Sequence, residues 1–571
     1  MRKQTFVISA IILTLGGFFA KAIGALYKIP LTNILGSSGM GVYYLIFPIY
    51  SLIISLCSSG VSVALTCEVA KCRKIRHKFN EQKLLRVSLL LSFFSSLIFA
   101  IIIIFSARYL ASLQGNVNAY TGYIAIAPSI ILSCLIATLR GYFQGIENMI
   151  PTTISLIVEQ IVKLGLGLIL AHKFCVYGIE YAVLGAVLGV TLSEVVALII
   201  IVINFLLYKG QLDFNFRNIC YKPKRKIQVP AIIKSKRNLV KTNYKSKKNH
   251  YVCNSKWVKY TNSVAIKKIL KIALPTTLSS ILIPISSMLD TFMIINLLFK
   301  SGYSMIVSTS LYGLWGGVIQ SLISLPTIVI SAITTSLVPS LSGLVYKNDT
   351  NEIRKKVAFY IKLTWVLSIF MFVCLYVFSP DILRFFYGEG LNDGVLNELE
   401  IATNMLKISS LSIIYYAFLQ TFTSILQTIG KSHVPFLTLL FAVVLRTFMV
   451  FVLTQIPSIN IYGVVISNIV YLGISDMVLT CVIIRKIELN FNGISLFKPL
   501  LYGIILLSVL ELSHMALQNV LGYINTTIIL ALVSLIVYPI LVYFGKVFNS
   551  HELKLFGKKK LTNAGKFKEK V

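Results

Sequence analysis

Long apolar segments recur from one end of the chain to the other, separated by shorter polar stretches. Each segment is close to the roughly 20 residues that an α-helix needs to cross the hydrocarbon core of a bilayer. No stretch between them is suited to fold as a sizeable soluble domain, so the pattern predicts an all-α polytopic membrane protein. The fourteen predicted spans lie near residues 6–29, 41–67, 84–108, 120–140, 152–171, 179–208, 269–299, 309–338, 357–379, 401–428, 435–454, 461–484, 497–517 and 525–546.

The composition agrees with this interpretation. Of the 571 residues, 56% are hydrophobic and only 13% are charged, whereas about 25% of the residues of a typical soluble domain are charged. The nine cysteines are scattered, with no CxxC pair and no clustering with histidine. Neither a disulfide framework nor a zinc site is therefore indicated.

Basic residues crowd alternate loops, as the positive-inside rule requires of cytoplasmic loops. One side of the predicted bundle carries residues 71–83, 209–268 and 346–356 together with a lysine-rich tail, and the longest loop of the other side, 379–400, has an acidic excess. Both termini are therefore expected to be cytoplasmic. An alternative interpretation makes residues 1–22 a cleaved signal peptide. Cleavage would leave thirteen spans and place the lysine-rich tail outside, against the charge rule.

Two sets of six spans flank the basic segment 209–268, and their polar residues correspond. The pairs that correspond are Gln144 with Gln427, Pro151 with Pro435, Lys163 with Arg446, and Ser193-Glu194 with Ser475-Asp476. Each set thus places a cation in its fifth span and a carboxylate, Glu194 or Asp476, in its sixth, and we expect these residues to be intramembrane charge partners. Because each set has an even number of spans, the two share one orientation and form parallel repeats, as in two-lobed transporters.

The predicted organisation has five parts. They are an N-lobe of spans one to six (1–208), a basic cytoplasmic linker (209–268), a C-lobe of spans seven to twelve (269–485), spans thirteen and fourteen (486–548) and a basic cytoplasmic tail (549–571). A nucleic-acid-binding arm is the alternative for the linker. We favour attraction to anionic lipid headgroups, at roughly 1 kcal/mol for each basic residue, and expect no nucleic-acid partner.

The first span carries two lysines where a helix facing lipid should have none. Gly17, Lys21, Gly24 and Lys28 are spaced so that they share one helical face. Because an ionisable residue at bilayer depth costs several kcal/mol, we expect this face to turn away from lipid. Lys21 is predicted to line a central cavity. Lys28 is placed either in the same cavity or at the headgroups, where its long side chain would reach the membrane surface.

Other intramembrane charges need partners as well. Glu159 and Lys163 are one helical turn apart, and we expect them to neutralise one another. Arg446 has no such neighbour on its own span, and Asp476 is its nearest candidate in sequence. Asp290 lies within span seven, the counterpart of span one, and is predicted to line the cavity together with the lysines.

Enzyme motifs are absent from the sequence. It contains no HExxH zinc motif, no GxSxG nucleophile elbow and no Walker-type glycine loop. We therefore expect no enzymatic activity and no resident cofactor, and an energy source other than bound ATP. The candidates are a coupling ion, H⁺ or Na⁺, and the membrane potential, worth about 2.3 kcal/mol per charge per 100 mV. Glu511 and His514 on span thirteen form either a proton site or a helix-packing pair.

Four parts of the chain carry a resemblance that covers nearly its whole length. They are QTFVISAIILTLGGFFAKAIGALYKI followed by GSSGMGVYYLIFPIY, RGYFQGIENMIPTTISLIVEQIVK (140–163), LPTIVISAITTSLVPSLS (325–342), and QTFTSILQTIGKSHVPF with IPSINIYGVVISN (456–468). In this order they resemble the stage V sporulation protein B group of polysaccharide-exporter proteins, within the multidrug, oligosaccharidyl-lipid and polysaccharide flippase superfamily. The resemblance implies two six-helix lobes plus two further helices, in the cytoplasmic membrane of a bacterium.

The resemblance also implies a substrate. Members of this group are expected to move undecaprenyl-diphosphate-linked sugars across the membrane for cell-wall or spore-cortex synthesis. The related lipid II flippases look similar in having cavity cations on spans one, two and eight. Lys21 falls where the first of these lies, whereas Tyr27 stands near the second, span two has no cation, and Gln320 or Ser321 occupies the region of span eight where an arginine would lie.

We therefore predict a flippase that works by alternating access. Its partners are membrane lipids and a lipid-linked saccharide, whose diphosphate Lys21 and Lys28 would bind as point charges. The alternative is a cation-coupled multidrug antiporter of the same superfamily, which should carry a carboxylate in the cavity of the N-lobe. A polytopic cell-envelope enzyme is a third interpretation, for which only the acidic loop 379–400 speaks. Nothing in the sequence specifies an oligomeric state.

Overall fold

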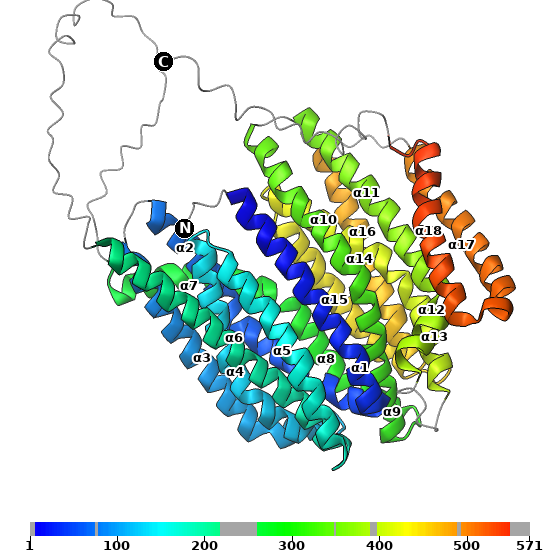
Figure 1. The fold of residues 1–571 in the computed structure, drawn as a ribbon, viewed down its shortest axis with the longest axis horizontal. Helices are drawn as coiled ribbons and strands as arrows, with labels where there is room; N and C mark the ends of the chain where they lie inside the picture. The colour runs from blue at the N-terminus through cyan, green and yellow to red at the C-terminus, as the bar shows by residue number, and fades with distance from the viewer. Residues whose placement is uncertain are drawn as a thin grey trace, which may run out of the picture.

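The computed structural model describes residues 6–74, 78–216, 260–347, 350–388, 397–487 and 493–548. All regular elements of these residues are helices, which form a bundle of long rods (Figure 1). The prediction of an all-α polytopic membrane protein is confirmed. Most of the predicted linker, 217–259, and the predicted tail, 549–571, lie outside the described residues.

The first helix, α1 (Phe6–Ile54), contains the first two predicted spans. A straight helix of 49 residues would measure about 74 Å, more than twice the roughly 30 Å of a hydrocarbon core. The helix is broken at Gly36, whose φ of 68° and ψ of −179° are not helical. Glycine adopts a positive φ without a steric penalty, so this residue lets the chain turn between the two spans.

The remaining N-lobe elements follow in chain order. They are the π-helical turn η1 (Ser55–Ser59), α2 (Gly60–Lys74), α3 (Lys78–Leu113), α4 (Ala119–Gly145), α5 (Ile150–Cys175) and α6 (Ile179–Phe216). Helices α5 and α6 cross closely, because a Cβ atom at Gly189 would lie 2.3 Å from the Cα atom of Gly167. Small residues permit such close backbone contact between membrane helices. This contact fixes the relative positions of Lys163 and Glu194, which these two helices carry.

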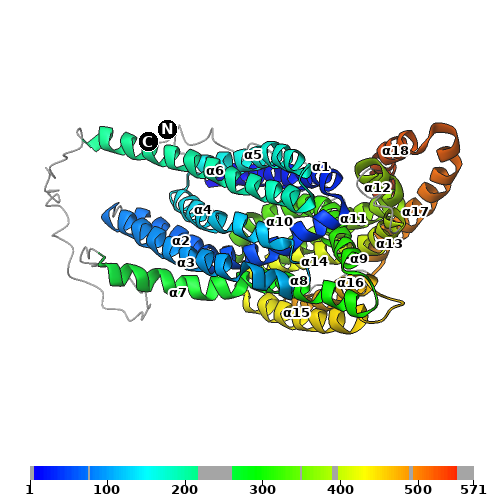
Figure 2. The same cartoon turned by 90° about the horizontal axis from the view of Figure 1, so that it is seen from below.

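The seventh predicted span is two helices, α7 (Asn262–Ser280) and α8 (Leu282–Lys300). Helix α7 packs against α2 and α3 of the N-lobe, beside which it lies in Figure 2. The contact is close because a Cβ atom at Gly60 would lie 2.3 Å from the carbonyl oxygen of Ala273. Ala265 and Ile269 extend the buried face of α7 by one turn each. The first half of the predicted C-lobe span therefore belongs, by its packing, with the N-lobe.

The C-lobe proper continues after α8. Its elements are α9 (Met305–Gly313), the π-helical turn η3 (Leu314–Ile319), α10 (Gln320–Lys347), α11 (Thr350–Val377), α12 (Ser379–Tyr387), α13 (Glu398–Ser410), α14 (Ser412–Thr428), α15 (His433–Thr454) and α16 (Tyr462–Ile487). Helix α8 packs against α15 and against α1. It thus joins the two lobes.

Two further helices, α17 (Gly493–Leu521) and α18 (Tyr523–Phe544), pack against each other and against α11. They lie at one edge of the molecule in Figure 2. Leu506 and Leu530 from these helices share a buried apolar cluster with Ile369 of α11. Helices α17 and α18 therefore attach to the C-lobe through α11.

Thirteen helical segments of the described residues are long and apolar enough to cross a membrane. The first of them, Ile12–Arg73, has 62 residues and includes the break at Gly36. The start of α1 and helix α2 lie toward the same end of the bundle in Figure 1, so this segment accounts for two crossings. Counted in this way, the described residues contain fourteen spans, as expected from the sequence.

Candidate functional site

A cavity of about 760 Å³ lies between the two lobes. Its N-lobe wall comes from α1, α5 and α6, and its C-lobe wall comes from α8, α9, η3, α10, α14, α15 and α16. Five charged side chains line it, and the sequence singles out all five: Glu159, Lys163, Glu194, Asp290 and Arg446. This volume is within the range of sites that hold small organic ligands.

On the C-lobe wall, Arg446 of α15 forms a two-point ion pair with Asp290 of α8. Its Nη2 atom lies 2.7 Å from Oδ2 of Asp290, and its Nη1 atom lies 3.0 Å from Oδ1. Nη1 also donates to the hydroxyl of Ser286 at 2.8 Å, and the guanidinium lies 5.6 Å from the centre of the Tyr471 ring. Both charged side chains are buried. A planar fork that meets a carboxylate in this way neutralises both charges inside the membrane.

The expected pairing of Arg446 with Asp476 is therefore wrong. Asp476 shares one face of α16 with Leu472 and Leu479, which are one turn away on either side and belong to a buried apolar cluster. Its side chain is buried, and within the described part of the chain neither carboxyl oxygen makes a hydrogen bond. The sequence repeat predicts the position of the Asp476 carboxylate on α16 but not its partner. The carboxylate that pairs with Arg446 is that of Asp290, on α8.

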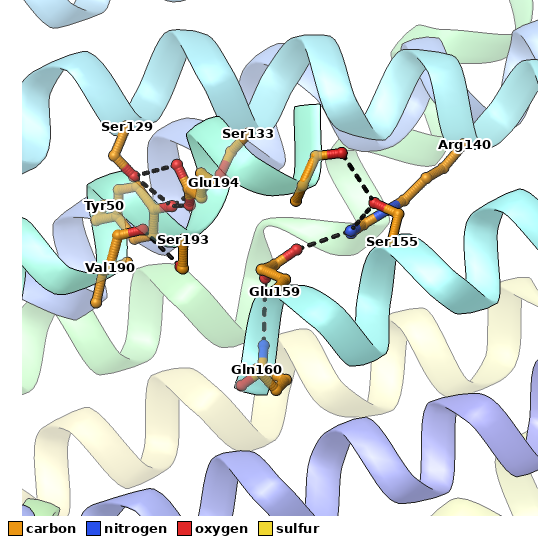
Figure 3. Close-up of polar contacts among 11 residues, drawn as sticks. Tyr50, Ser129, Ser133, Arg140, Ser155, Glu159, Gln160, Val190, Ser193 and Glu194 are labelled. Atoms are coloured by element: carbon orange, nitrogen blue, oxygen red, sulfur yellow. Dashed lines mark hydrogen bonds and ion pairs between the residues drawn. The ribbon is translucent and has the colours of Figure 1, made fainter. Parts of the chain in front are cut away.

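On the N-lobe wall, Glu159 pairs with Arg140 of α4. The Nη2 atom of Arg140 lies 2.7 Å from Oε2 of Glu159, and it also donates to the hydroxyl of Ser155 at 2.7 Å (Figure 3). The expected neutralisation of Glu159 by Lys163 is thus wrong, although the two are one turn apart. The guanidinium reaches the carboxylate from the neighbouring helix and occupies it.

Lys163 is left without an ion pair among the described residues. Its Nζ atom lies 5.2 Å from the centre of the Tyr27 ring and 5.5 Å from the centre of the Phe47 ring. The attraction of a cation to an aromatic face is worth only about 0.5–2 kcal/mol. An anion at the same distance from Lys163 would attract it more strongly. Lys163 is therefore the charged group of the cavity wall best placed to receive an anion from a ligand.

Glu194 of α6 lies in a group of hydroxyls. Tyr50 of α1 and Ser133 of α4 donate to its Oε1 atom, the latter at 2.5 Å, and Ser129 of α4 donates to Oε2 (Figure 3). The hydroxyls also contact one another, with Tyr50 2.8 Å from Ser133 and 3.0 Å from Ser129. Only 4% of the residue is exposed. No ion pair of Glu194 occurs among the described residues, and its direct polar contacts there are these hydrogen bonds.

The predicted cavity role of Lys21 does not agree with the packing of α1. Lys21 is exposed and is not part of the cavity wall, and a Cβ atom at Gly17 would meet nothing within 4 Å. Of the predicted face, Gly24 does contact α5: a Cβ atom there would lie 2.8 Å from Gln160, and one at Gly16 would lie 2.1 Å from Thr153. The predicted face is therefore only partly turned toward the neighbouring helix. A contact between Lys21 and substrate stays a prediction.

Lys28 lies closer to the cavity than Lys21 does. It is half-buried, and its Nζ atom lies 5.1 Å from the centre of the ring of Tyr44, which lines the cavity. Its charge also acts on that of Lys163. Lys28 thus adds positive potential behind the N-lobe wall without forming part of it. Whether it touches the substrate stays a prediction.

The two lobes meet closely where α1 crosses α9. A Cβ atom at Gly41 would lie 2.1 Å from the carbonyl oxygen of Thr309, and one at Gly313 would lie 2.0 Å from that of Ser37. The hydroxyl of Ser37 also donates to Glu398 of α13 at 2.7 Å. Helix α9 lies at the end of the bundle away from α2 and the start of α7 (Figure 1). At that end the lobes are therefore in direct backbone contact.

Sequence reasoning missed the uncharged partners of Glu194. Ser129 and Ser133 are one turn apart in the predicted span 120–140, a spacing that is visible in the sequence. Tyr50 gave no such signal, because it is 144 positions from Glu194 in the chain. Groups of three or more His, Cys, Asp or Glu side chains that would hold a metal ion do not occur within the described ranges.

Comparisons with known proteins agree with this architecture. Residues 6–228 match the model of the "Polysaccharide biosynthesis protein" family, and residues 275–452 match the "MatE" family. The chain is 24% identical to stage V sporulation protein B of Bacillus subtilis (strain 168) over 468 residues, which cover 82% of this chain and 81% of that protein. It is 21% identical to the lipid II flippase MurJ of the same organism over 525 residues, 90% of this chain and 88% of that one.

Among solved structures, the lipid II flippase MurJ in an inward closed conformation superposes with a TM-score of 0.67 at 15% identity, covering 94% of this chain and 99% of that one. Likeness at this level of identity shows a common fold. The first family match ends at residue 228, within the predicted linker 209–268, and the second begins after the linker, at residue 275. The chain is a multi-pass membrane protein with the fold of the lipid II flippase MurJ and of MATE transporters, and its two halves match the polysaccharide biosynthesis and MatE families in turn.

Proposed function

We propose that this transporter is a flippase that exports an undecaprenyl-diphosphate-linked saccharide across the cytoplasmic membrane, for cell-wall or spore-cortex synthesis. The observation that carries the proposal is Lys163, a cation in the wall of the cavity between the lobes with no ion pair among the described residues. A diphosphate would supply the missing anion and form charge-assisted hydrogen bonds with the ammonium group.

The opposite wall suits a saccharide. Gln420 and Asn468 offer amide groups, and the Oε1 atom of Gln420 is buried without a hydrogen bond among the described residues. Trp315 adds an aromatic surface. Amides satisfy sugar hydroxyls, and a few convergent polar groups in an otherwise apolar cavity fix the orientation of a ligand. The headgroup would thus lie between Lys163 and the amides, and the polyprenyl chain would stay in lipid.

Alternating access follows from the position of the cavity. Both termini are proposed to be cytoplasmic, so that the headgroup enters from the side of the basic loops and leaves near α9 after the contact of α1 with α9 opens. An inside-negative membrane potential favours outward movement of an anion, at about 2.3 kcal/mol per charge per 100 mV. A coupling ion, H⁺ or Na⁺, is the other proposed energy source.

Relatives support the proposal by what their names state. One is a lipid II flippase, and another is a sporulation protein. A cation-coupled multidrug antiporter is the second candidate, because the N-lobe wall of the cavity carries the carboxylates Glu194 and Glu159, and a carboxylate there is what such a pump requires.

Reconstitution into proteoliposomes separates the two candidates. Translocation of fluorescent lipid II is measured by protection from a membrane-impermeant quencher, and uptake of a cationic dye is measured in the same preparation under H⁺ and Na⁺ gradients. We expect lipid II to cross and the dye not to accumulate. Ion-driven dye uptake without lipid II translocation would overturn the proposal in favour of the antiporter.

A further inference from the structure

Of the charged side chains that line the cavity, Lys163 and Glu194 have no ion pair among the described residues, and the proposed function uses only Lys163. The carboxyl group of Glu194 is buried and faces the cavity, and three hydroxyl groups surround it. A full negative charge with no cation beside it costs several kcal/mol in such surroundings. Binding one proton removes that charge while the hydroxyls keep their hydrogen bonds, since a protonated carboxyl both donates and accepts.

We infer that Glu194 is a proton-binding site whose occupancy controls the affinity of the cavity for an anion at Lys163. The inference rests on the proposed function for the identity of the anion. The proton would be held on Glu194 and shared with the hydroxyl groups of Tyr50, Ser129 and Ser133 (Figure 3).

The oxygen atoms of the site favour a proton over a metal cation. The hydroxyl of Tyr50 lies 2.8 Å from that of Ser133 and 3.0 Å from that of Ser129, so these oxygen atoms lie within hydrogen-bonding distance of one another. A sodium ion would require these oxygens to separate and to turn their lone pairs toward a common centre. The Glu194 carboxyl group and the three hydroxyls already contain both hydrogen-bond donors and acceptors, so the carboxyl group can bind a proton without any of these oxygen atoms moving apart.

The link to anion binding is electrostatic. The negative charge of Glu194 interacts electrostatically with the positive charge of Lys163 on the neighbouring helix. An anion that approaches Lys163 therefore meets a weaker positive potential when Glu194 is ionised. A proton on Glu194 removes this effect, so the anion binds more tightly. By thermodynamic linkage, binding of the anion promotes uptake of a proton by the same factor.

Other titratable groups face Glu194 from the helices that pack against α6. They are Tyr50 on α1, Cys134 on α4, and Glu159 and Lys163 on α5. Glu159 is held by Arg140. The experiment therefore has to remove the ionisation of Glu194 alone, which Glu194→Gln does with little change in size.

The first arm of the test is infrared spectroscopy of the purified protein in lipid as a function of pH. We expect a protonated-carboxyl band that Glu194→Gln removes and that Glu511→Gln, a control on α17 outside both lobes, retains. Tyr50→Phe should move the midpoint of the titration of this band, whereas Ser193→Ala should not, because the hydroxyl of Ser193 donates within its own helix, to the backbone carbonyl of Val190 at 2.7 Å. A spectrum unchanged by Glu194→Gln would overturn the inference.

The second arm measures binding of a water-soluble short-chain polyprenyl diphosphate at a series of pH values. The titration of the ligand itself cancels when wild type and Glu194→Gln are compared at each pH. Glutamine mimics the protonated state, so the variant should bind more tightly than wild type at high pH, by about 5-fold to about 150-fold, and equally at low pH. A constant affinity ratio across the pH range would refute the control of anion affinity by Glu194.

The two arms also distinguish failure of the proposed function from failure of the proton-binding inference. If wild type binds no diphosphate at any pH, the proposed function fails and the linkage fails with it, while the infrared band decides the proton site alone. Binding that depends on Na⁺ and not on pH would assign the oxygen cluster to a metal cation, and would overturn the proton assignment.

Discussion

The crossing of α1 and α9 offers the sharpest test of alternating access. At this point Gly41 of the N-lobe lies against the backbone of the C-lobe, and a Cβ atom there would lie 2.1 Å from the carbonyl oxygen of Thr309 and 2.7 Å from its Cγ2 atom. Backbone atoms cannot move aside as a flexible side chain does. Gly41→Ala must therefore push the lobes apart at this end.

The cost of this substitution falls on the state in which α1 and α9 touch. Overpacking of a tight contact typically costs about 1–3 kcal/mol. If the state with the lobes separated at this end escapes the penalty, its population relative to the contact state rises by about fivefold to about 150-fold. Gly17→Ala is the matched control, since it lies on the same helix with no atom within 4 Å of the added Cβ.

Thiol labelling measures this shift. Ser287 lines the cavity, and Ser287→Cys in a chain whose nine native cysteines are replaced provides one reporter. Intact cells are treated with a membrane-impermeant maleimide from the outside. We expect Gly41→Ala to raise the labelling rate within the range above and Gly17→Ala to leave it unchanged. Equal rates in all three chains would refute the assignment of this crossing as the barrier on the outer side.

Two predictions concern stability, measured as the thermal unfolding of the purified protein in detergent. Arg446→Gln leaves the Asp290 carboxylate buried without its cation, which costs about 3–5 kcal/mol, so the unfolding temperature should fall, and adding Asp290→Asn should recover most of the loss. A double variant no more stable than the single one would contradict the pairing. Asp476→Leu replaces a buried carboxyl group that makes no hydrogen bond in the described structure with an apolar side chain in an apolar cluster. The unfolding temperature should be unchanged or higher, in line with a penalty of about 1–3 kcal/mol for an unsatisfied buried group, and a marked fall would show that Asp476 has a partner.

The spans of this fold are predictable from sequence because the bilayer imposes a local rule. Any helix that crosses needs a run of apolar residues, and this requirement can be read along the chain without knowledge of neighbours. The break at Gly36 was not predicted as such, since hydropathy shows two apolar runs and not how they are joined. The packing of α7 against the N-lobe was missed for the same reason: it depends on Gly60, a residue of another helix.

The charge pairs were harder to predict because they depend on how each helix is rotated and on what its neighbours offer. Glu159 and Lys163 satisfy the one-turn rule, but the guanidinium of Arg140 reaches Glu159 first. For Asp476, the neighbours Leu472 and Leu479 at one-turn spacing marked an apolar face, and this signal outweighs the match to the repeat. The identity of the cavity-lining charges was predictable, whereas their partners were not.

Lys163 is the group proposed to bind the diphosphate, and its replacement tests alternating export of the lipid-linked saccharide most directly. Translocation of fluorescent lipid II in proteoliposomes should be compared between wild type, Lys163→Gln, and Lys173→Gln, which removes an exposed lysine from the same helix. A hydrogen bond to a charged group contributes about 1.5–3 kcal/mol. Lys163→Gln should therefore raise the lipid II concentration that gives half the maximal translocation rate by about tenfold to about 150-fold, whereas Lys173→Gln should behave like wild type. Equal translocation by all three proteins at every lipid II concentration would contradict the account.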